Sequence, residues 1–213
     1  MLYYDEVFHS IQGEGTDAGR MCIFVRLFGC NIGCSYCDQP QTVKKNKHKI
    51  SIENLLTLIR RENKGINYVC ITGGEPLLQE DVYILTYDLV AAGYEVSIET
   101  SGCVPIEEDS YNRSFKYVMD IKCPSSGVSS KNVLNNLLIL KRKDEVKFVI
   151  KDRKDYDYAK KIILNYPTKA KFLFSPVFID NKPIIGSKLI NWIYDDKLNA
   201  RVQIQMHKVL EVH

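Results

Sequence analysis

Six short apolar segments along the chain have the composition of buried β-strands. They lie at residues 21–28, 67–72, 94–99, 116–121, 145–150 and 171–177, and they are rich in the β-branched and aromatic residues that favour strands. Apolar residues at helical spacing fall between them, near 51–62, 79–92, 130–141, 154–165 and 186–195. Ser51 is a good N-cap for the first of these helices.

This alternation predicts an α/β fold. Near-continuous apolar strands separated by helices indicate βαβ units and a parallel sheet that is buried on both faces. Right-handed crossovers would wind such a chain into an open sheet or a partial barrel, whose working face lies at the carboxyl ends of the strands. The sequence has 213 residues and no internal repeat, so we expect one domain over residues 1–213.

Composition narrows the class of protein. Hydrophobic residues make up 45% of the chain and charged residues 26%, which is typical of a soluble globular protein. A net charge of +3 gives no argument for binding to nucleic acid or to a membrane. The first residues show no secretory leader, and no apolar run approaches the roughly 18 residues of a membrane helix. We therefore expect a cytoplasmic protein, in which clustered cysteines bind metals more often than they form disulfides.

Three of the seven cysteines lie close together, directly after the segment 21–28. Cys30, Cys34 and Cys37 have the spacing C-x3-C-x2-C. A [4Fe–4S] cluster is usually held by four thiolates, so three local ligands leave one iron open to another ligand. The alternative is a structural zinc site, which needs a fourth Cys or His at matching spacing. The candidates for that fourth ligand are isolated in the sequence: Cys70, Cys103, Cys123 and His48.

The cysteine spacing resembles the signature of the radical S-adenosylmethionine enzymes. The resemblance implies a partial (β/α)6 barrel, with a [4Fe–4S] cluster on Cys30, Cys34 and Cys37. It also implies that S-adenosylmethionine binds the unique iron through its amino and carboxylate groups. One electron then cleaves the sulfonium to a 5′-deoxyadenosyl radical, which abstracts hydrogen from a substrate.

Polar segments follow several of the predicted strands. They are Thr72–Pro76 (TGGEP), Glu99–Gly102 (ETSG), Asp120–Gly127 and Ser175–Phe178. Taken alone, each is equally well a turn or a solvated loop. In the resemblance these segments surround S-adenosylmethionine, and the implied cofactor-binding residues are Tyr36, Asp38, Gly73, Gly74, Glu75, Glu99, Ser101, Cys123, Pro124, Ser125, Ser175, Pro176, Val177 and Phe178.

The segment SIQGEG at residues 10–15, followed by VRLFGC at 25–30, resembles the 7-carboxy-7-deazaguanine synthases of the queuosine pathway. The resemblance continues through TGGEP and ETSG to residues 205–208. It implies conversion of 6-carboxy-5,6,7,8-tetrahydropterin to 7-carboxy-7-deazaguanine with loss of ammonia, S-adenosylmethionine being regenerated in each turnover. The implied substrate-binding residues are Ile11, Gln12, Gly13, Glu14, Arg26, Thr72, His207 and His213.

The residue types suit a pterin. The amide of Gln12 can donate and accept, the carboxylate of Glu14 can accept from N–H groups, and Arg26 can pair with a carboxylate in a bidentate manner. Simpler interpretations stay open. The segment 8–15 could be only a turn, Arg26 could form an internal ion pair, and the residues around His207 could be a frayed tail.

One position departs from the family pattern. The family has Thr or Ser after the Cys-Asp pair, where its hydroxyl reaches Mg²⁺, whereas this chain has Gln39. An amide oxygen can ligate a hard cation, so magnesium use is open. The basic run Lys44–Lys49 is a candidate docking site for an acidic one-electron donor such as flavodoxin, and we expect a homodimer.

Two rival functions remain. An activase that makes a glycyl radical on a partner protein also carries C-x3-C-x2-C in a short chain, although SIQGEG is not expected there. A non-catalytic iron–sulfur or zinc module is the other rival. It would leave TGGEP and the polar strand ends without a purpose.

Overall fold

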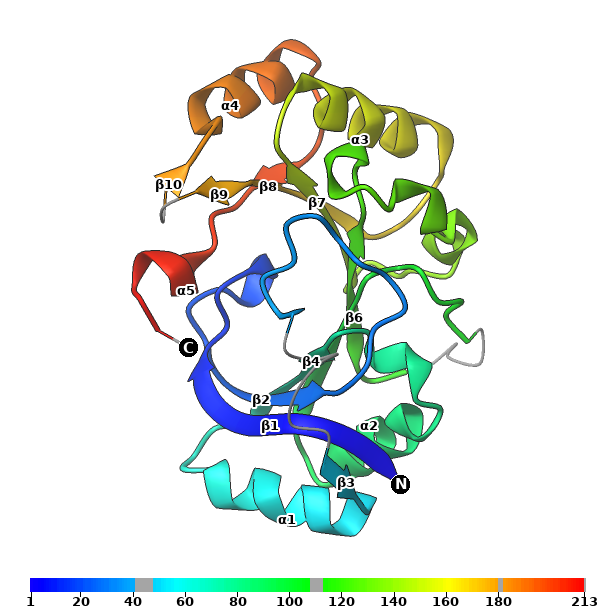
Figure 1. The fold of residues 1–213 in the computed structure, drawn as a ribbon, viewed down its shortest axis with the longest axis vertical. Helices are drawn as coiled ribbons and strands as arrows, with labels where there is room; N and C mark the ends of the chain where they lie inside the picture. Colours follow the sequence, from blue (N-terminus) through cyan, green and yellow to red (C-terminus); the bar gives the residue numbers. More distant parts are fainter. Residues whose placement is uncertain (41–47, 108–112, 180–181, 213) are drawn as a thin grey trace.

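A curved, mostly parallel sheet organises the chain as an open barrel (Figure 1). The computed structural model describes residues 1–40, 48–107, 113–179 and 182–212. Within these residues the sheet has the order β11-β8-β7-β6-β5-β4-β2-β1-β3. Neighbours from β2 to β11 are parallel, whereas β1 pairs antiparallel with both β2 and β3.

The elements have the following bounds. The strands of the sheet are β1 (Leu2–Ile11), β2 (Met21–Leu27), β3 (His48–Ile50), β4 (Tyr68–Gly73), β5 (Glu95–Thr100), β6 (Lys116–Ile121), β7 (Glu145–Ile150), β8 (Lys171–Pro176) and β11 (Arg201–Val202). A small hairpin is formed by β9 (Phe178–Ile179) and β10 (Lys182–Pro183). The helices are α1 (Ile52–Glu62), α2 (Asp81–Ala91), α3 (Arg153–Asn165), α4 (Gly186–Asp195) and α5 (Met206–Val209).

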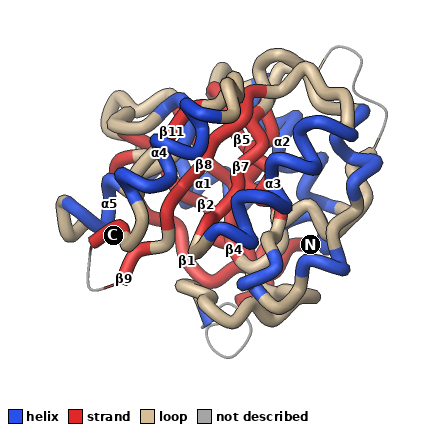
Figure 2. Tube along the Cα trace, turned by 90° about the horizontal axis from the view of Figure 1, so that it is seen from above, coloured by secondary structure: helices blue, strands red, loops and turns tan. Residues whose placement is uncertain are grey.

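The core lies between the sheet and the helices around it. The long helices lie outside the strands (Figure 2), with α1 on β1 and β2, α2 on β5 and α3 on β7. Leu55 and Ile59 of α1, Leu85 of α2 and Tyr156 of α3 are fully buried in one apolar cluster. Each buried side chain of this size stabilises the fold by about 1.5–3 kcal/mol, so these contacts hold the helices against the sheet.

Most of the predicted elements are confirmed. The six predicted strands are β2, β4, β5, β6, β7 and β8, and the predicted helices near 51–62, 79–92, 154–165 and 186–195 are α1 to α4. The Ser51 hydroxyl caps α1 by accepting from the backbone N–H of Asn54 at 3.2 Å. The segment 8–15 divides: its first residues complete β1, and a turn and the 3₁₀-helix η1 (Gly15–Asp17) follow.

The predicted helix near 130–141 is wrong. This stretch forms two 3₁₀-helices, η5 (Ser129–Lys131) and η6 (Leu134–Leu138). Asn136 accepts from the backbone N–H of Ile106 and donates to the carbonyl of Val104, while Asn132 accepts from the N–H of Lys122. Side-chain amides that bind neighbouring backbone groups compete with helix formation, so the apolar spacing here does not give an α-helix.

Candidate active site

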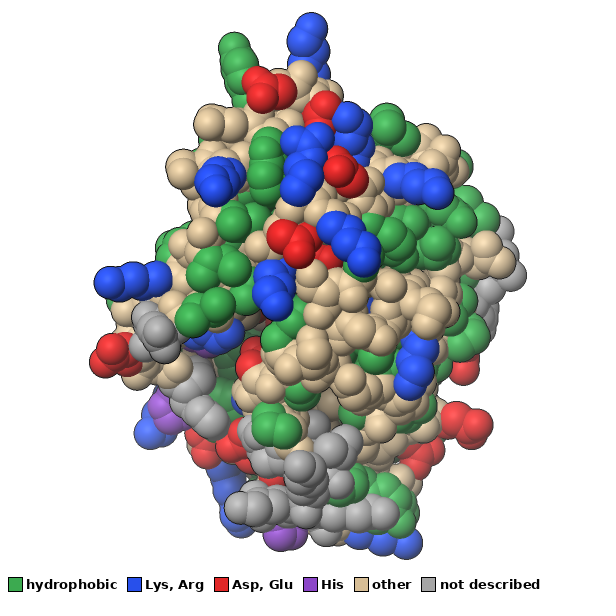
Figure 3. Space-filling model, turned by 45° about the horizontal axis from the view of Figure 1, so that its top comes forward, with side chains coloured by type: hydrophobic (Ala, Val, Ile, Leu, Met, Phe, Trp, Pro, Cys, Tyr) green, Lys and Arg blue, Asp and Glu red, His purple; other side chains and the backbone are tan. Residues whose placement is uncertain are grey.

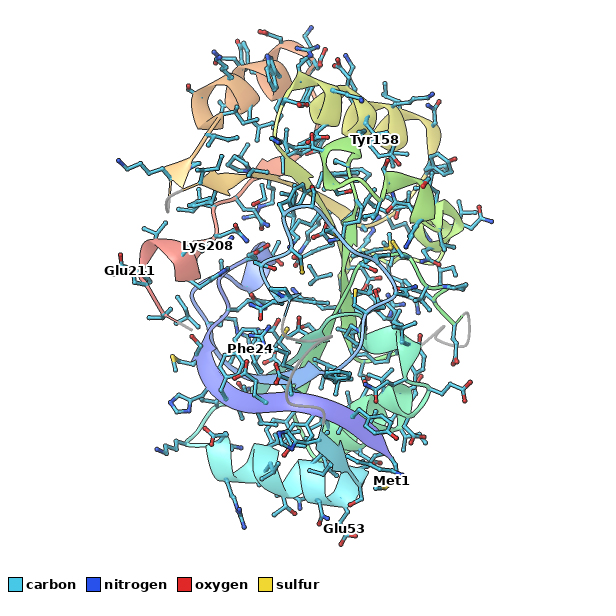
Figure 4. All side chains as sticks on the ribbon, in the orientation of Figure 1. Met1, Phe24, Glu53, Tyr158, Lys208 and Glu211 are labelled. Atoms are coloured by element: carbon cyan, nitrogen blue, oxygen red, sulfur yellow. The ribbon has the colours of Figure 1, made fainter. Side chains whose placement is uncertain are left out.

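One cavity of about 610 Å³ opens at the carboxyl ends of the parallel strands. The loop after β2, the ends of β4, β5, β6 and β7, and the segment around α5 line it. Phe24 of β2 points into the arc of strands, whereas Glu53 points away from it on α1 (Figure 4). The β/α fold therefore brings segments distant in sequence to one site, as expected for parallel sheets.

The thiols of Cys30, Cys34 and Cys37 all line this cavity. The neighbouring 3₁₀-helix η4 (Pro124–Ser126) anchors their loop: Ser35 donates its N–H to Ser126 O at 2.9 Å and its hydroxyl to Ser125 O at 2.8 Å. Burial raises the pKa of Cys30 and of Cys34 above that of an ordinary thiol. Binding iron would therefore displace protons from these two sulfurs.

The donor set fits a [4Fe–4S] cluster with S-adenosylmethionine. Cys30, Cys34 and Cys37 line one cavity, and thiolates are the usual ligands of such clusters. The described residues contain no group of three or more His, Cys, Asp or Glu side chains placed to hold a single metal ion. Two buried polar atoms on the cavity wall, Tyr36 Oη and Asp120 Oδ1, have no hydrogen-bond partner among the described residues. Polar groups of this kind are normally satisfied, and a polar ligand in the cavity would do so.

The TGGEP turn packs tightly against the cysteine loop. A Cβ atom on Gly74 would lie 2.2 Å from the carbonyl oxygen of Gly29 and 2.7 Å from Cβ of Cys30. The next residue, Glu75, donates its backbone N–H to that same carbonyl at 2.8 Å. Glycine at position 74 therefore allows the two loops to meet.

The carboxylate of Glu75 does not line the cavity. It is fully buried and accepts from Leu77 N at 3.0 Å, from Ser101 N at 2.7 Å and from the hydroxyls of Thr100 and Ser101. The side chain thus joins the TGGEP turn to the ETSG turn. The structure gives Glu75 a scaffolding geometry, whereas the motif implied contact with the cofactor.

A second carboxylate, Glu99, joins two predicted substrate residues. Glu99 accepts from the amide of Gln12 at 3.1 Å and from the hydroxyl of Thr72 at 3.1 Å. The other end of the Gln12 amide accepts the backbone N–H of Glu14 at 3.1 Å. All four residues line the cavity, so Gln12 and Thr72 are held in fixed orientations before any ligand arrives.

A row of alternating charges crosses the cavity wall. Glu14 pairs with Lys147 at 2.7 Å, Lys147 with Asp120 at 3.4 Å, and Asp120 with Lys122 at 3.0 Å. Gln205 also donates to Glu14, at 2.7 Å. Burial would raise the pKa of Glu14, but the charge and hydrogen bond of Lys147, with smaller contributions from Gln205 and His207, outweigh it and lower the pKa to about 2. Glu14 is therefore a carboxylate at neutral pH.

The segment around α5 closes the cavity beside this row. The backbone N–H of Met206 donates to Gly13 O at 2.9 Å, and the imidazole of His207 lies directly on Gly13, where a Cβ would be 2.0 Å from its Nδ1. Burial lowers the pKa of His207, although the charge of Glu14 opposes this effect. The imidazole is therefore neutral at pH 7.

Arg26 lies on the wall beside Phe8. Its Nε donates to Glu6 at 2.7 Å, and its guanidinium lies 5.2 Å from the centroid of the Phe8 ring. Arg26 thus forms an internal ion pair and also lines the cavity, where a substrate could reach it.

Most of the residues predicted from the sequence lie around one cavity. Those that line it are Ile11, Gln12, Gly13, Glu14, Arg26, Cys30, Cys34, Tyr36, Cys37, Asp38, Gln39, Thr72, Gly73, Gly74, Glu99, Ser101, Val177, Phe178 and His207. Those that do not are Glu75, Cys123, Pro124, Ser125, Ser175 and Pro176. His213 and Lys44 to Lys47 fall outside the described residues.

Lys122 and Lys147 line the cavity but were not among the predicted site residues. Lys147 lies in β7 between apolar neighbours. Its side chain points to the inner face of the sheet, as does that of Val149 two residues later. A charged residue within a buried strand is rare unless it is paired. That signal was present in the sequence, but its partner Glu14 could not be identified from it.

Comparisons with known proteins agree with this geometry. Residues 25–116 match the model of the radical SAM superfamily. The 7-carboxy-7-deazaguanine synthase of Methanospirillum hungatei is 42% identical over 96% of this chain and 83% of its own length, and that of Koribacter versatilis is 37% identical over 96% and 95%. The crystal structure of QueE from Escherichia coli superposes with a TM-score of 0.74 at 24% identity, over 97% of this chain and 94% of that one, and supports the fold. The chain belongs to the 7-carboxy-7-deazaguanine synthase family of radical SAM enzymes.

Proposed function

We propose that this protein converts 6-carboxy-5,6,7,8-tetrahydropterin to 7-carboxy-7-deazaguanine with release of ammonia. The observation that carries the proposal is the lining of the cavity. Cys30, Cys34 and Cys37 line it from one loop, and polar side chains line it from other segments: Gln12, Glu14, Arg26, Thr72 and His207. A redox cofactor and a polar heterocycle can thus be held side by side.

The cysteines and the loops around them form the cofactor side. Cys30, Cys34 and Cys37 would hold a [4Fe–4S] cluster, which with S-adenosylmethionine supplies a 5′-deoxyadenosyl radical that takes hydrogen from the pterin. Gly73 and Gly74 leave backbone groups accessible at the end of β4, where a small polar ligand can approach closely. Ser101, Val177 and Phe178 also line the cavity and suit contact with the nucleoside part.

The polar residues form the substrate side. Glu14 is ionised and can accept from the N–H groups of the pterin's guanidine-like edge, and a charge-assisted bond of this kind contributes about 1.5–3 kcal/mol. Arg26 can pair with the 6-carboxylate, and the Thr72 hydroxyl, held by Glu99, has a fixed direction. The neutral His207 can donate from one ring nitrogen and accept at the other.

The last described residues belong to the same site. Val212 lines the cavity, and the N–H of Val212 donates to His207 O at 3.1 Å. This contact supports a role in pterin binding for His213, the next residue in the sequence. His213→Ala should then raise KM for the pterin about fivefold, as for the loss of one hydrogen bond of about 1 kcal/mol. Unaltered KM in this variant would refute the contact.

The experiment that tests the proposed function is anaerobic turnover. Iron- and sulfide-reconstituted protein is reduced and supplied with S-adenosylmethionine and 6-carboxy-5,6,7,8-tetrahydropterin, and the product is identified by mass and ultraviolet spectrum. We expect 7-carboxy-7-deazaguanine and ammonia in equal amounts. Cleavage of S-adenosylmethionine with the pterin recovered unchanged would favour a protein substrate, as in the activases. Reconstituted protein that never cleaves S-adenosylmethionine would favour a non-catalytic module.

Further parts of the proposal concern partners and location. We expect a homodimer, tested by light scattering after gel filtration, and a flavodoxin-like electron donor that docks near Lys44–Lys49, tested by the loss of turnover at raised salt. On the upper part of the surface seen in Figure 3, Lys and Arg side chains are mixed with Asp and Glu. Gln39 lines the cavity and is the candidate Mg²⁺ ligand.

No helix among the described residues is long and apolar enough to span a bilayer, and we expect the protein in the cytoplasm.

A further inference from the structure

Lys147 is a cation held between two carboxylates on the wall of the cavity. Its ammonium lies 2.7 Å from Glu14 Oε2 and 3.4 Å from Asp120 Oδ2. The side chains of Lys147 and Glu14 are only 13% and 12% exposed. The roles proposed above for the cysteine loop and the TGGEP turn do not involve this pair, so a buried cation at this position needs an explanation of its own.

The hydrogen bonds of Glu14 show what the cation does for it. Oε1 accepts from Gln205 at 2.7 Å, and Oε2 accepts from Lys147 at 2.7 Å and from Gln203 at 3.3 Å. An ionised carboxylate has roughly four acceptor positions. These three donors fix its plane and leave capacity for a further donor from the cavity.

We propose that Lys147 is the positioning residue that keeps Glu14 ionised and correctly oriented to receive an N–H group of the pterin. This inference deepens the proposed function and rests on it. It concerns affinity for the substrate only, and gives Lys147 no contact with S-adenosylmethionine and no proton to transfer.

The charged groups around the pair identify Lys147 as the ammonium that holds Glu14. Glu14 faces two titratable groups: Lys147 of β7 and His207 of α5. The imidazole of His207 is neutral at pH 7. Gln203 and Gln205 are neutral donors. On its other side Lys147 faces Asp120 of β6 and Glu99 of β5, with Lys122 beyond Asp120. Without the ammonium of Lys147, Glu14 would lose this ion pair and would keep the neutral donors Gln203 and Gln205.

Removing only the charge of Lys147 should therefore introduce a titration. Glu14 is held at a pKa of about 2 against the effect of burial, and buried glutamates without a partner have pKa values as high as about 8–9. With Gln at position 147 the pKa of Glu14 should rise into the neutral range. Because the ionised form accepts the pterin N–H more strongly than the protonated form does, KM should then increase as pH falls through that raised pKa.

The test is the KM for 6-carboxy-5,6,7,8-tetrahydropterin between about pH 6 and pH 8.5, expressed as the ratio of variant to wild type. The ratio cancels titration of the substrate itself. Lys147→Gln keeps a donor toward Glu14 and removes the charge, Lys147→Met removes both, and Lys147→Arg keeps the charge. Lys160→Gln is the matched control, because Lys160 also pairs with an acid, Asp196 at 2.5 Å, but does not line the cavity. Circular dichroism checks that each variant is folded.

For Lys147→Gln and Lys147→Met we expect the ratio of variant KM to wild-type KM to be about tenfold larger at pH 6 than at pH 8.5. A change of this size follows if Glu14 in these variants has an apparent pKa near 7. The ratio for Lys147→Arg, for Lys160→Gln and for the double variant Lys147→Gln/Glu14→Gln should not change with pH. Binding of S-adenosylmethionine by equilibrium dialysis should match wild type in the Lys147 variants. A flat ratio in a folded Lys147→Gln or Lys147→Met protein overturns the inference. Wild-type protein that does not convert the pterin overturns the proposed function instead.

Discussion

Substitution of Glu75 separates a scaffolding role from a cofactor contact. The Glu75→Ala variant removes the acceptor of the Leu77 N–H, the Ser101 N–H and the two hydroxyls of Thr100 and Ser101. The hydroxyls can turn toward other acceptors, but the two amide groups are fixed by the turns. Each buried donor left unsatisfied costs about 1–3 kcal/mol. For the two amides together we therefore expect a loss of about 2–6 kcal/mol in the free energy of unfolding.

The assay is thermal unfolding of the cluster-free protein, followed by circular dichroism, since no cofactor contact can contribute there. At about 2–4 °C per kcal/mol for a chain of this size, Tm should fall by about 10 °C. Glu53→Ala is the control, because Glu53 is exposed on α1 (Figure 4), and its change should stay within about 0.5 kcal/mol. An unchanged Tm together with weakened S-adenosylmethionine binding would refute the scaffolding role and restore the direct contact implied by the GGE motif.

Three further predictions concern the cysteine loop and the metal. Alanine at Cys30, Cys34 or Cys37 should abolish the absorption of a reconstituted cluster, whereas Cys22→Ala and Cys70→Ala should keep it, because both of those thiols are buried in another apolar cluster. Gly74→Ala should lower the iron content per chain, since its Cβ would displace the Gly29 carbonyl; full iron content would show that the loop adapts. Gln39→Thr should strengthen the stimulation of turnover by Mg²⁺, because a short hydroxyl suits the rigid octahedral site of that ion. Equal stimulation of both proteins would contradict the last of these.

The fold was predictable because the apolar composition of a buried strand is visible in its own sequence. β2 is buried from Cys22 to Leu27, and its sequence is almost continuously apolar, while Ser51 marks the start of α1. The helix predicted over 130–141 is absent for a physical reason. Its apolar residues have helical spacing, but Asn132 and Asn136 use their amides on backbone groups of distant loops. Such bonds depend on tertiary structure and leave no local pattern.

The site was predictable where the chemistry is local. The cysteine spacing lies within one loop, so three ligands could be named from it. The partners of charged strand residues come from other parts of the chain: Lys147 pairs with Glu14, and Asp120 with Lys122 and Lys147. The direction of the Glu75 side chain was also hidden, because it depends on how the ETSG turn packs against TGGEP.

The central claim is that this chain ring-contracts a pterin and uses S-adenosylmethionine as a cofactor. The most direct measurement gives reduced, reconstituted protein 6-carboxy-5,6,7,8-tetrahydropterin in large excess over S-adenosylmethionine. The amounts of 7-carboxy-7-deazaguanine and 5′-deoxyadenosine are then measured by mass spectrometry. We predict product far in excess of the S-adenosylmethionine supplied, with little 5′-deoxyadenosine. One 5′-deoxyadenosine per product, or 5′-deoxyadenosine with no product, would contradict the account.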